Sequence, residues 1–274
     1  MPFLLKIRLF LCAKCQNDYF CFTMEQESLK NLLAKQSEML WKEYIPHISV
    51  DCAVFGFHES ALKVLLVRLK DQELWSLPGG YMGKNEEIKD AANRILSERT
   101  GVTNIYLQQF KVFADINRSE DFFADFPEGL WHKQRFISVG FYALVNYADV
   151  VPVVDEFSGD SEWVDIDAIP PMMMDHRSIL DKALLTLRRQ LNYKPIGNKL
   201  LPEEFTMPEL QKLYEIILGK KLNRGNFYRK MIGYDILDKQ EESRRGGAHK
   251  SPNLYKFNLE KYAAALHNGF KEGW

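Results

Sequence analysis

The chain has 274 residues, of which 46% are hydrophobic and 27% charged, and its formal net charge is -1. This length supplies one large hydrophobic core or two modest ones, because domains commonly contain roughly 100–200 residues. The nearly neutral total excludes attraction of the whole chain to nucleic acid, so any such binding depends on local basic clusters. No apolar run approaches the ~20 residues of a membrane-spanning helix. We expect a cytoplasmic protein of two domains.

The N-terminal segment, residues 1–23, contains three of the four cysteines. Cys12 and Cys15 have the spacing of half a zinc site, but no second Cys or His pair follows, so we expect no metal and no cofactor. The segment is similar to a short signal peptide, without a clean small-residue cleavage site. Because a well-patterned helix begins at Met24, residues 1–23 are interpreted as an appendage, and Met24 as a possible true start.

Alternating strand and helix patterns follow from residue 49 to about residue 193. Apolar and β-branched runs predict strands, and helices are indicated by apolar residues on one face, such as Ala91 and Leu96. Such an order favours a mixed α/β sandwich. The predicted strands are residues 49–57, 61–69, 105–115, 135–145 and 161–166, and the predicted helices are residues 86–99 and 172–193.

A smaller unit follows a segment rich in Pro and Gly, which we interpret as a linker. The unit is expected to contain helices over 207–220 and 224–237, followed by two strands around a Gly-Gly loop. Helix, turn, helix and basic hairpin form the winged variant of the helix-turn-helix. The predicted divisions are an appendage (1–23), an effector-binding domain (24–190), a linker (191–204) and a DNA-binding domain (205–274).

The most specific motif begins at Gly80. Five residues separate Gly80 from Glu86, and seven residues separate Glu86 from Arg94. This spacing resembles the Nudix box, G-x5-E-x7-R-E-U-x-E-E-x-G-U, in which U is aliphatic. Agreement at many fixed offsets is far more specific than a lone glycine motif. The residues in register are Gly80, Glu86, Arg94, Leu96, Glu98, Gly101 and Val102.

The box departs from the family at two of its acidic positions. In an active Nudix enzyme, three glutamates corresponding to positions 95, 98 and 99 gather around divalent cations on the substrate diphosphate. Here they are Ile95, Glu98 and Arg99. Magnesium prefers a shell of oxygen ligands, and a guanidinium repels it. We therefore expect no catalytic residues. Glu86 and Glu98 remain as ligands for a weak metal site, but Glu98 can equally pair with Arg94 one turn earlier.

A degenerate Nudix domain followed by a winged helix resembles the Nudix-related (NrtR-like) transcriptional regulators. This resemblance implies a dimeric repressor that senses ADP-ribose or a related nucleotide. A branch in Bacteroidetes (AraR-like) senses arabinose, and the absence of diphosphate-metal chemistry favours that sugar. The implied partners are operator DNA, a small effector and a second copy of the chain. The runner-up hypothesis is a weak or atypical Nudix hydrolase of nucleoside diphosphate sugars, and a protein-interaction module explains the box poorly.

Candidate effector-binding residues are those that bear a cation or an aromatic ring near strand ends of the first domain. Arginine suits phosphate or hydroxyl groups, and aromatic rings stack on ligands. Each is also a common surface or core residue, and His132 and His176 are open to the same two interpretations, with His176 favoured as structural. The candidates are Arg68, Arg99, Arg135, Phe136 and Trp163.

Candidate DNA-binding residues fall into two basic groups. From Lys220 to Lys256 the sequence contains ten basic residues and only four acidic ones. In the second helix Phe227, Met231 and Ile232 fit a core-facing stripe, which leaves the polar residues for the major groove. A solvated surface would look similar, but two basic elements in one unit favour DNA. The groups are Arg224, Asn226, Tyr228, Arg229 and Lys230 on the helix and Arg244, Arg245, His249 and Lys250 on the hairpin.

Overall fold

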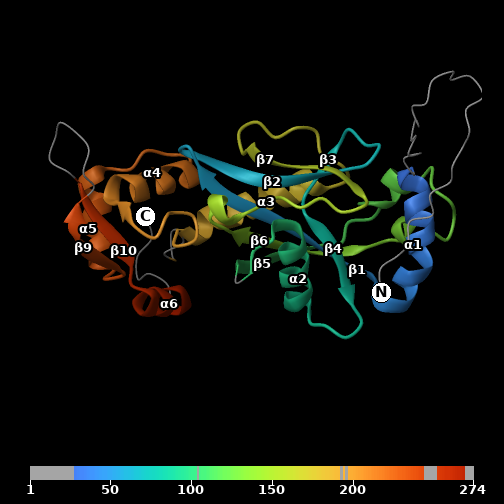
Figure 1. Ribbon diagram of the computed structural model, residues 1–274, viewed down its shortest axis with the longest axis horizontal. Coiled ribbons are helices and arrows are strands. Elements are labelled where there is room, and N and C mark those ends of the chain that lie inside the picture. Colours follow the sequence, from blue (N-terminus) through green and yellow to red (C-terminus); the bar gives the residue numbers. More distant parts are fainter. Residues whose placement is uncertain (1–27, 104, 192–193, 195–196, 244–251, 269–274) are drawn as a thin grey trace, which may run out of the picture.

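The structure is a computed structural model, which describes residues 28–103, 105–191, 194, 197–243 and 252–268. A larger unit with a seven-stranded sheet is followed by a smaller unit with a three-stranded sheet. Figure 1 shows the two units end to end, with helix α1 (Leu29–Glu43) at the end far from the smaller unit. No helix in these ranges is long and apolar enough to cross a membrane.

The large sheet is mixed, as the sequence predicts. Its strand order is β3-β2-β1-β6-β5, while β4 pairs with β1 and β7 pairs with β2. Strands β1 and β6 are parallel, and the other pairings are antiparallel. The strands are β1 (Tyr44–His58), β2 (Ala61–Leu69), β3 (Trp75–Ser76), β4 (Gly79–Gly83), β5 (Tyr106–Phe113), β6 (Ile137–Leu144) and β7 (Ser158–Asp165).

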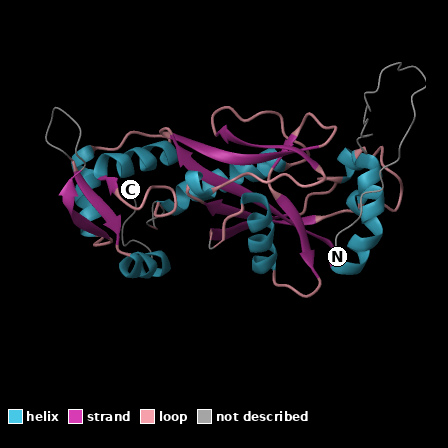
Figure 2. Ribbon diagram, viewed as in Figure 1, coloured by secondary structure: helices cyan, strands magenta, loops and turns pink. Residues whose placement is uncertain are grey.

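Helices cover both faces of this sheet because successive side chains of a strand point to opposite faces. Along β1, Val50 and Val54 pack in a core with helix α2 (Ile88–Thr100). Ala53 and Phe55 belong instead to the core that contains helix α3 (His176–Leu191). Figure 2 shows these helices beside the strands. The layered architecture expected from the sequence is therefore confirmed.

Helix α2 carries the Nudix box, and its apolar face is the one that the sequence predicts. Ala91, Ala92, Ile95 and Leu96 are all buried against the sheet. The helix ends at Gly101, whose φ of 69° lies in the left-handed region. Glycine adopts this conformation without the penalty that a Cβ would bring, so the last glycine of the box has a structural role.

A cap on the larger unit is formed by α1 and the segment between β5 and β6. That segment contains two 3-10 helices, η1 (Glu120–Phe123) and η2 (Trp131–Lys133). Leu33 of α1 packs with Phe123 and Leu130 of the segment. A third 3-10 helix, η3 (Tyr147–Asp149), follows β6. The cap closes one side of the larger unit with apolar contacts.

The smaller unit has the expected winged-helix order. The side chain of Thr206 accepts a hydrogen bond from the backbone of Glu209, and the Glu209 side chain accepts one from the backbone of Thr206. This reciprocal capping box fixes the start of α4. The elements are β8 (Phe205–Thr206), α4 (Met207–Leu218), α5 (Arg224–Gly233), β9 (Leu237–Ser243), β10 (Asn253–Phe257) and α6 (Leu259–Asn268), with sheet order β8-β10-β9.

The two units share one hydrophobic core. Leu187 and Leu191 of α3 belong to the same buried cluster as Leu213 of α4. In the segment that the sequence marks as a linker, Leu200 and Leu201 are also buried in that cluster. The junction is therefore packed through apolar side chains, and α3 connects the large sheet to the smaller unit.

Candidate functional site

The larger unit contains an open cavity of about 200 Å³ where β1, β2, β4, the cap and the start of α3 meet. Leu33 of α1 and Phe123 of η1 contribute apolar parts of its wall. A concave site with a few convergent polar groups is typical of a small-molecule pocket. The polar lining residues are Ser49, Asp51, Ser76, Arg99, Arg118, Ser119, His132, Asp155 and His176.

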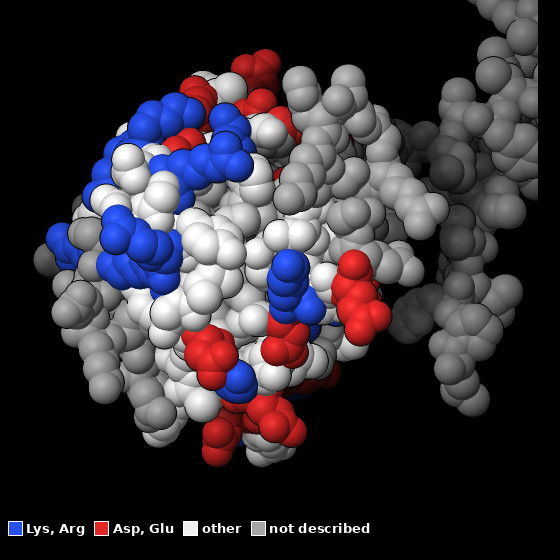
Figure 3. All heavy atoms as spheres, turned by 90° about the vertical axis from the view of Figure 1, so that its left-hand side faces the viewer, with Lys and Arg blue, Asp and Glu red and all other residues white. Residues whose placement is uncertain are grey.

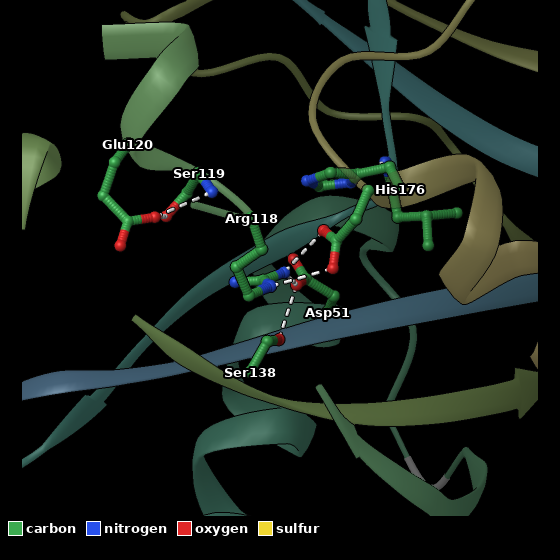
Figure 4. A network of polar contacts seen from close by, with 8 residues as sticks. Asp51, Arg118, Ser119, Glu120, Ser138 and His176 are labelled. Atoms are coloured by element: carbon green, nitrogen blue, oxygen red, sulfur yellow. Dashed lines mark hydrogen bonds and ion pairs between the residues drawn. The ribbon is translucent and has the colours of Figure 1, made fainter. Parts of the chain in front are cut away.

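Arg118 lies in this wall, and a network of ion pairs and hydrogen bonds holds its side chain. The Nε and Nη2 atoms of Arg118 donate to the two carboxylate oxygens of Asp175 over 2.9 and 2.8 Å. Nη2 also donates to Oδ2 of Asp51 over 3.3 Å, and Ser138 donates to the same oxygen over 2.5 Å. Figure 4 shows Asp51, Arg118 and Ser138 converging, whereas Glu120 turns towards Ser119. The network joins β1, β6, the loop after β5 and the start of α3.

Two histidines of the wall differ in their surroundings. The Nδ1 atom of His176 accepts a hydrogen bond of 3.0 Å from the backbone N–H of Leu77. His132 is buried between the rings of Tyr81 and Phe123, and its Nδ1 atom has no hydrogen-bond partner among the described residues. Burial lowers the pKa of His132 to about 4. His132 is therefore neutral at physiological pH and adds no cation to the cavity.

The box residues that would hold a cation in an enzyme have structural partners here. Ile95 is 2% exposed within the core between α2 and the sheet. A Cβ on Gly80 would lie 3.0 Å from Ile95, so the glycine leaves the room that the isoleucine fills. Glu86 binds Arg94 over 2.6 Å, and the expected pairing of Glu98 with Arg94 is confirmed, at 3.6 Å.

Arg99 is held by an acidic residue across the cavity wall. Its guanidinium lies 2.6 Å from Asp155 and donates to Ser158 over 3.3 Å. Burial raises the pKa of Asp155, but hydrogen bonds from Arg99 and Ser158 outweigh this effect, so the net shift is downward. Within the described ranges no group of three or more His, Cys, Asp and Glu side chains could hold a metal ion.

The predicted effector-binding residues divide between the cavity and other places. Arg99 and Phe136 line the cavity. Arg68 lies outside its lining and pairs with Asp160 over 3.3 Å, while Trp163 of β7 packs against Tyr147 of η3. Arg135 is exposed and donates to a backbone carbonyl near the end of β5. Contact with an effector in this cavity therefore remains a prediction for Arg99 and Phe136, while the other three side chains lie elsewhere.

Sequence reasoning missed Arg118, Asp51 and Asp175. The one signal available was the position of Asp175 and His176 near the start of the helix predicted over residues 172–193. Arg118 follows β5 in a segment without periodicity, and its partners are 57 and 67 residues away. A buried arginine held by distant carboxylates cannot be distinguished from a surface arginine by local pattern.

A second candidate site is the outer face of α5. Phe227 and Met231 are buried, as the sequence predicts, but Ile232 is 42% exposed, so that part of the core prediction is wrong. Residues four apart share a helix face, and the residue after Met231 is turned about 100° away. Tyr228 is 44% exposed, and the exposed polar residues of this face are Arg224, Asn226 and Arg229, with Lys230 half-buried.

Charge is unevenly distributed over the smaller unit. In Figure 3, which faces this end of the molecule, Lys and Arg side chains gather on one side, and several Asp and Glu side chains gather at the lower edge. On α5, Nη2 of Arg229 donates to Oδ1 of Asn226 over 2.6 Å. The hairpin group Arg244, Arg245, His249 and Lys250 lies outside the described residues.

The fold and these two sites define a class of protein, a degenerate Nudix domain joined to a winged helix. A model of the NUDIX domain family matches residues 45–183, and a model of the NrtR DNA-binding winged helix domain matches residues 197–257. The chain belongs to the NrtR-like family of Nudix-related transcriptional regulators. The arabinose-sensing branch is not confirmed by these matches.

Relatives support the whole arrangement. The chain is 30% identical over 224 residues to the ADPR responsive transcriptional repressor NtrR of Acinetobacter baylyi, covering 79% of this chain and 84% of the relative. It is 25% identical to Shewanella oneidensis NrtR, with a TM-score of 0.68 over 83% of this chain and 100% of that one. The latter protein has also been crystallised with a 27mer DNA, and that structure gives the same identity and TM-score over 83% of this chain and 99% of that one.

Proposed function

We propose that this protein is a ligand-responsive transcriptional repressor, in which an effector bound in the larger unit controls operator binding by the smaller unit. One observation carries the proposal: the helix that begins at the cavity, α3, packs on the winged helix through a shared core. A repressor that binds DNA as a homodimer on a two-fold-related operator is the arrangement that winged-helix geometry favours.

The first candidate effector is ADP-ribose. The Acinetobacter relative is named as ADPR responsive, and the alignment covers most of this chain and most of the relative. Phe136 and Tyr81 offer aromatic rings at the cavity, with centroids 5.3 Å apart, which suits contact with a base or a ribose. The cavity of about 200 Å³ is smaller than typical ligand pockets of roughly 300–1,000 Å³, so it does not enclose a whole ADP-ribose in this structure.

A second candidate effector is a small neutral sugar such as arabinose. Two features favour it: the cavity measures about 200 Å³, and both arginines of its wall are already paired with carboxylates. A diphosphate needs cations that are not neutralised by the protein, whereas sugar hydroxyls bind well to paired charges, carboxylates and serines. Carboxylates from Asp51 and Asp155 in the wall add to this preference.

Hydrolysis is not part of the proposed function. Arg99 and Ile95 occupy positions at which the enzymes carry metal-binding acids, and Glu86 and Glu98 are paired with Arg94. A weak Nudix hydrolase of nucleoside diphosphate sugars is the alternative. Release of ribose 5-phosphate and AMP from ADP-ribose, with magnesium or manganese, at about one turnover per second or faster would establish that alternative.

The test of the proposed function uses the full chain. A duplex is first selected from random sequences, and its affinity is then measured by fluorescence anisotropy with ADP-ribose, arabinose or neither. We expect one ligand to weaken operator binding, by about 5- to 150-fold. The same ligand should raise the melting temperature of the protein, since it binds the native state. Recovery of no preferred sequence, or of no ligand that changes the affinity, would refute the proposal.

A further inference from the structure

Arg118 occupies an unusual position in the cavity wall. Its side chain is only 3% exposed, yet it is one of the residues that line the cavity. It lies in the loop after β5, and its charge is compensated by Asp51 and Asp175. Burial lowers the pKa of Arg118, but the hydrogen bonds and charges of these carboxylates outweigh that effect and raise it. The guanidinium is therefore charged, and Arg118 lies in the wall of the cavity.

Part of this guanidinium is available to a ligand. Arginine has five N–H donors in a planar fork. Three of them, on Nε and Nη2, are directed at Asp175 and Asp51. The hydrogen bonds that Arg118 makes to described residues use Nε and Nη2, which leaves the remaining nitrogen, Nη1, outside this network. Arg118 is one of the cavity-lining residues, so Nη1 is the donor that an acceptor oxygen of a bound molecule would use.

The two carboxylates belong to different parts of the fold. Asp51 lies on β1 in the centre of the sheet, where it accepts from Ser138. A Cβ on Gly79 would lie only 2.6 Å from Asp51, so the adjacent backbone closely confines this carboxylate. Asp175, in contrast, immediately precedes α3, and its backbone carbonyl accepts from Ile179 in the first turn. A shift of Arg118 relative to Asp51 therefore displaces the start of α3.

Helix α3 extends from this point to the DNA-binding unit. From His176 to Arg188 the helix rises about 18 Å, at 1.5 Å per residue. At its far end Arg188 donates to the backbone carbonyl of Ile217 in α4 over 2.7 Å. Tyr214 of α4 in turn contacts Phe227 of α5, with ring centroids 5.4 Å apart. A packed path thus connects Arg118 to the helix that carries the candidate base-reading residues.

We infer that Arg118 binds an acceptor oxygen of the effector and that Asp175 transmits this binding to α3 and the winged helix. The inference rests on the proposed function. It adds which residue binds the effector and which residue transmits that binding to the winged helix. A ligand changes an equilibrium only by binding one state better than the other. An oxygen bound at Nη1 would provide that difference by favouring one position of Arg118, and Asp175 is bound to Arg118 by two hydrogen bonds.

The experiment compares variants of the two residues with matched controls on the exposed side of α3. Arg177 and Asp181 pair with each other over 3.0 Å and are both more than half exposed. The variants are therefore Arg118→Gln, Arg118→Lys and Asp175→Asn, and the controls are Arg177→Gln and Asp181→Asn. Circular dichroism melts establish that each chain folds. Calorimetry with ADP-ribose and with L-arabinose gives ligand affinity, and anisotropy with the selected duplex gives operator affinity with and without ligand.

We expect Arg118→Gln to weaken ligand binding by roughly 10- to 150-fold, as removal of a charged hydrogen bond does. Arg118→Lys keeps the charge without the fork and should also weaken it. In Asp175→Asn, the ratio of operator affinities without and with ligand should fall towards one, while both controls keep the wild-type ratio. If Arg118→Gln does not fold, the lysine and asparagine variants carry the test.

Two results would overturn the inference. One is wild-type ligand affinity in both Arg118 variants, and the other is a wild-type affinity ratio in Asp175→Asn. Either leaves the proposed function intact, because wild-type protein still shows ligand-dependent operator binding. If wild-type protein itself shows no such dependence, the proposed function fails and the inference fails with it.

Discussion

Nε of Arg188, near the end of α3, donates a hydrogen bond of 2.7 Å to the backbone carbonyl of Ile217 in α4. The last four carbonyls of a helix accept no hydrogen bond from the helix itself. Because α4 ends at Leu218, the carbonyl of Ile217 is one of these four. A guanidinium at this end therefore satisfies a backbone group and complements the helix dipole. The interaction links the larger unit to the smaller unit by a charged group as well as by apolar packing.

Replacing this arginine should loosen the junction. We expect Arg188→Ala to lower the free energy of unfolding by about 1.5–3 kcal/mol, the usual contribution of a hydrogen bond to a charged group. Arg177→Ala, which removes an exposed pair on the same helix, should cost less than about 1 kcal/mol. Urea unfolding followed by tryptophan fluorescence measures both. Equal losses in the two variants would show that the Arg188 hydrogen bond contributes nothing specific.

Acid sensitivity should arise in part from His132. Its pKa is about 4 in the folded protein because of burial, against about 6.5 in an unfolded chain. The unfolded state therefore binds a proton that the folded state does not, and stability falls as the pH falls from about 6.5 towards 4. Between pH 7 and pH 5 the free energy of unfolding should fall by about 2 kcal/mol from this source.

The measurement compares urea unfolding at pH 7 and pH 5 for wild type and His132→Phe. Phenylalanine keeps a ring beside Tyr81 and Phe123 and does not titrate. Carboxylates such as Glu86, whose pKa is lowered by its hydrogen bond to Arg94, also reduce stability in acid, and they are unchanged in the variant. A pH dependence as steep in His132→Phe as in wild type would exclude the histidine as its source.

Ile95 provides a direct test of the altered box. The side chain is 2% exposed and surrounded by apolar residues, so Ile95→Glu buries a carboxylate without a partner. We expect the free energy of unfolding to fall by about 3 kcal/mol or more. Ile95→Val, which keeps an apolar side chain, should cost only about 0.5–1.5 kcal/mol. Chemical denaturation with and without magnesium decides: a glutamate variant that magnesium stabilises would mean that a metal site can still form here.

The fold could be predicted because its signals are local and repeated. In α2, Ala91, Ala92 and Leu96 recur at helical spacing and are buried, and Gly101 ends the helix in the conformation that glycine permits. The box register identified the family, and its fixed offsets do not depend on tertiary contacts. Short strands such as β3 (Trp75–Ser76) were missed, since two residues carry no periodicity.

The candidate site was less accessible to sequence reasoning. Phe136 and Arg99 line the cavity, and their contact with an effector stays a prediction, whereas Arg68 was placed by strand position alone and pairs with Asp160. The buried network depends on Arg118 meeting carboxylates from distant segments, which a single sequence does not encode as a pattern. Residues 57 and 67 positions apart along the chain meet only through the topology of the sheet.

The last prediction concerns recognition of DNA by α5, where Arg229 donates to Asn226 over 2.6 Å and both side chains are exposed. Because this bond occupies the amide oxygen of Asn226, the pair presents N–H donors, which match the acceptors O6 and N7 of guanine. Asn226→Ala should cost about 1–3 kcal/mol of operator binding and relax discrimination at particular bases. Arg229→Ala should do the same. If Arg229 also neutralises a phosphate, its removal makes the negative slope of log affinity against log salt shallower by about one.

Anisotropy titrations at several salt concentrations, on the selected duplex and on single-base variants, separate these effects, with Arg177→Ala as the control outside the winged helix. Uniform weakening on every sequence by both variants would assign α5 to the phosphate backbone and refute base reading by this pair.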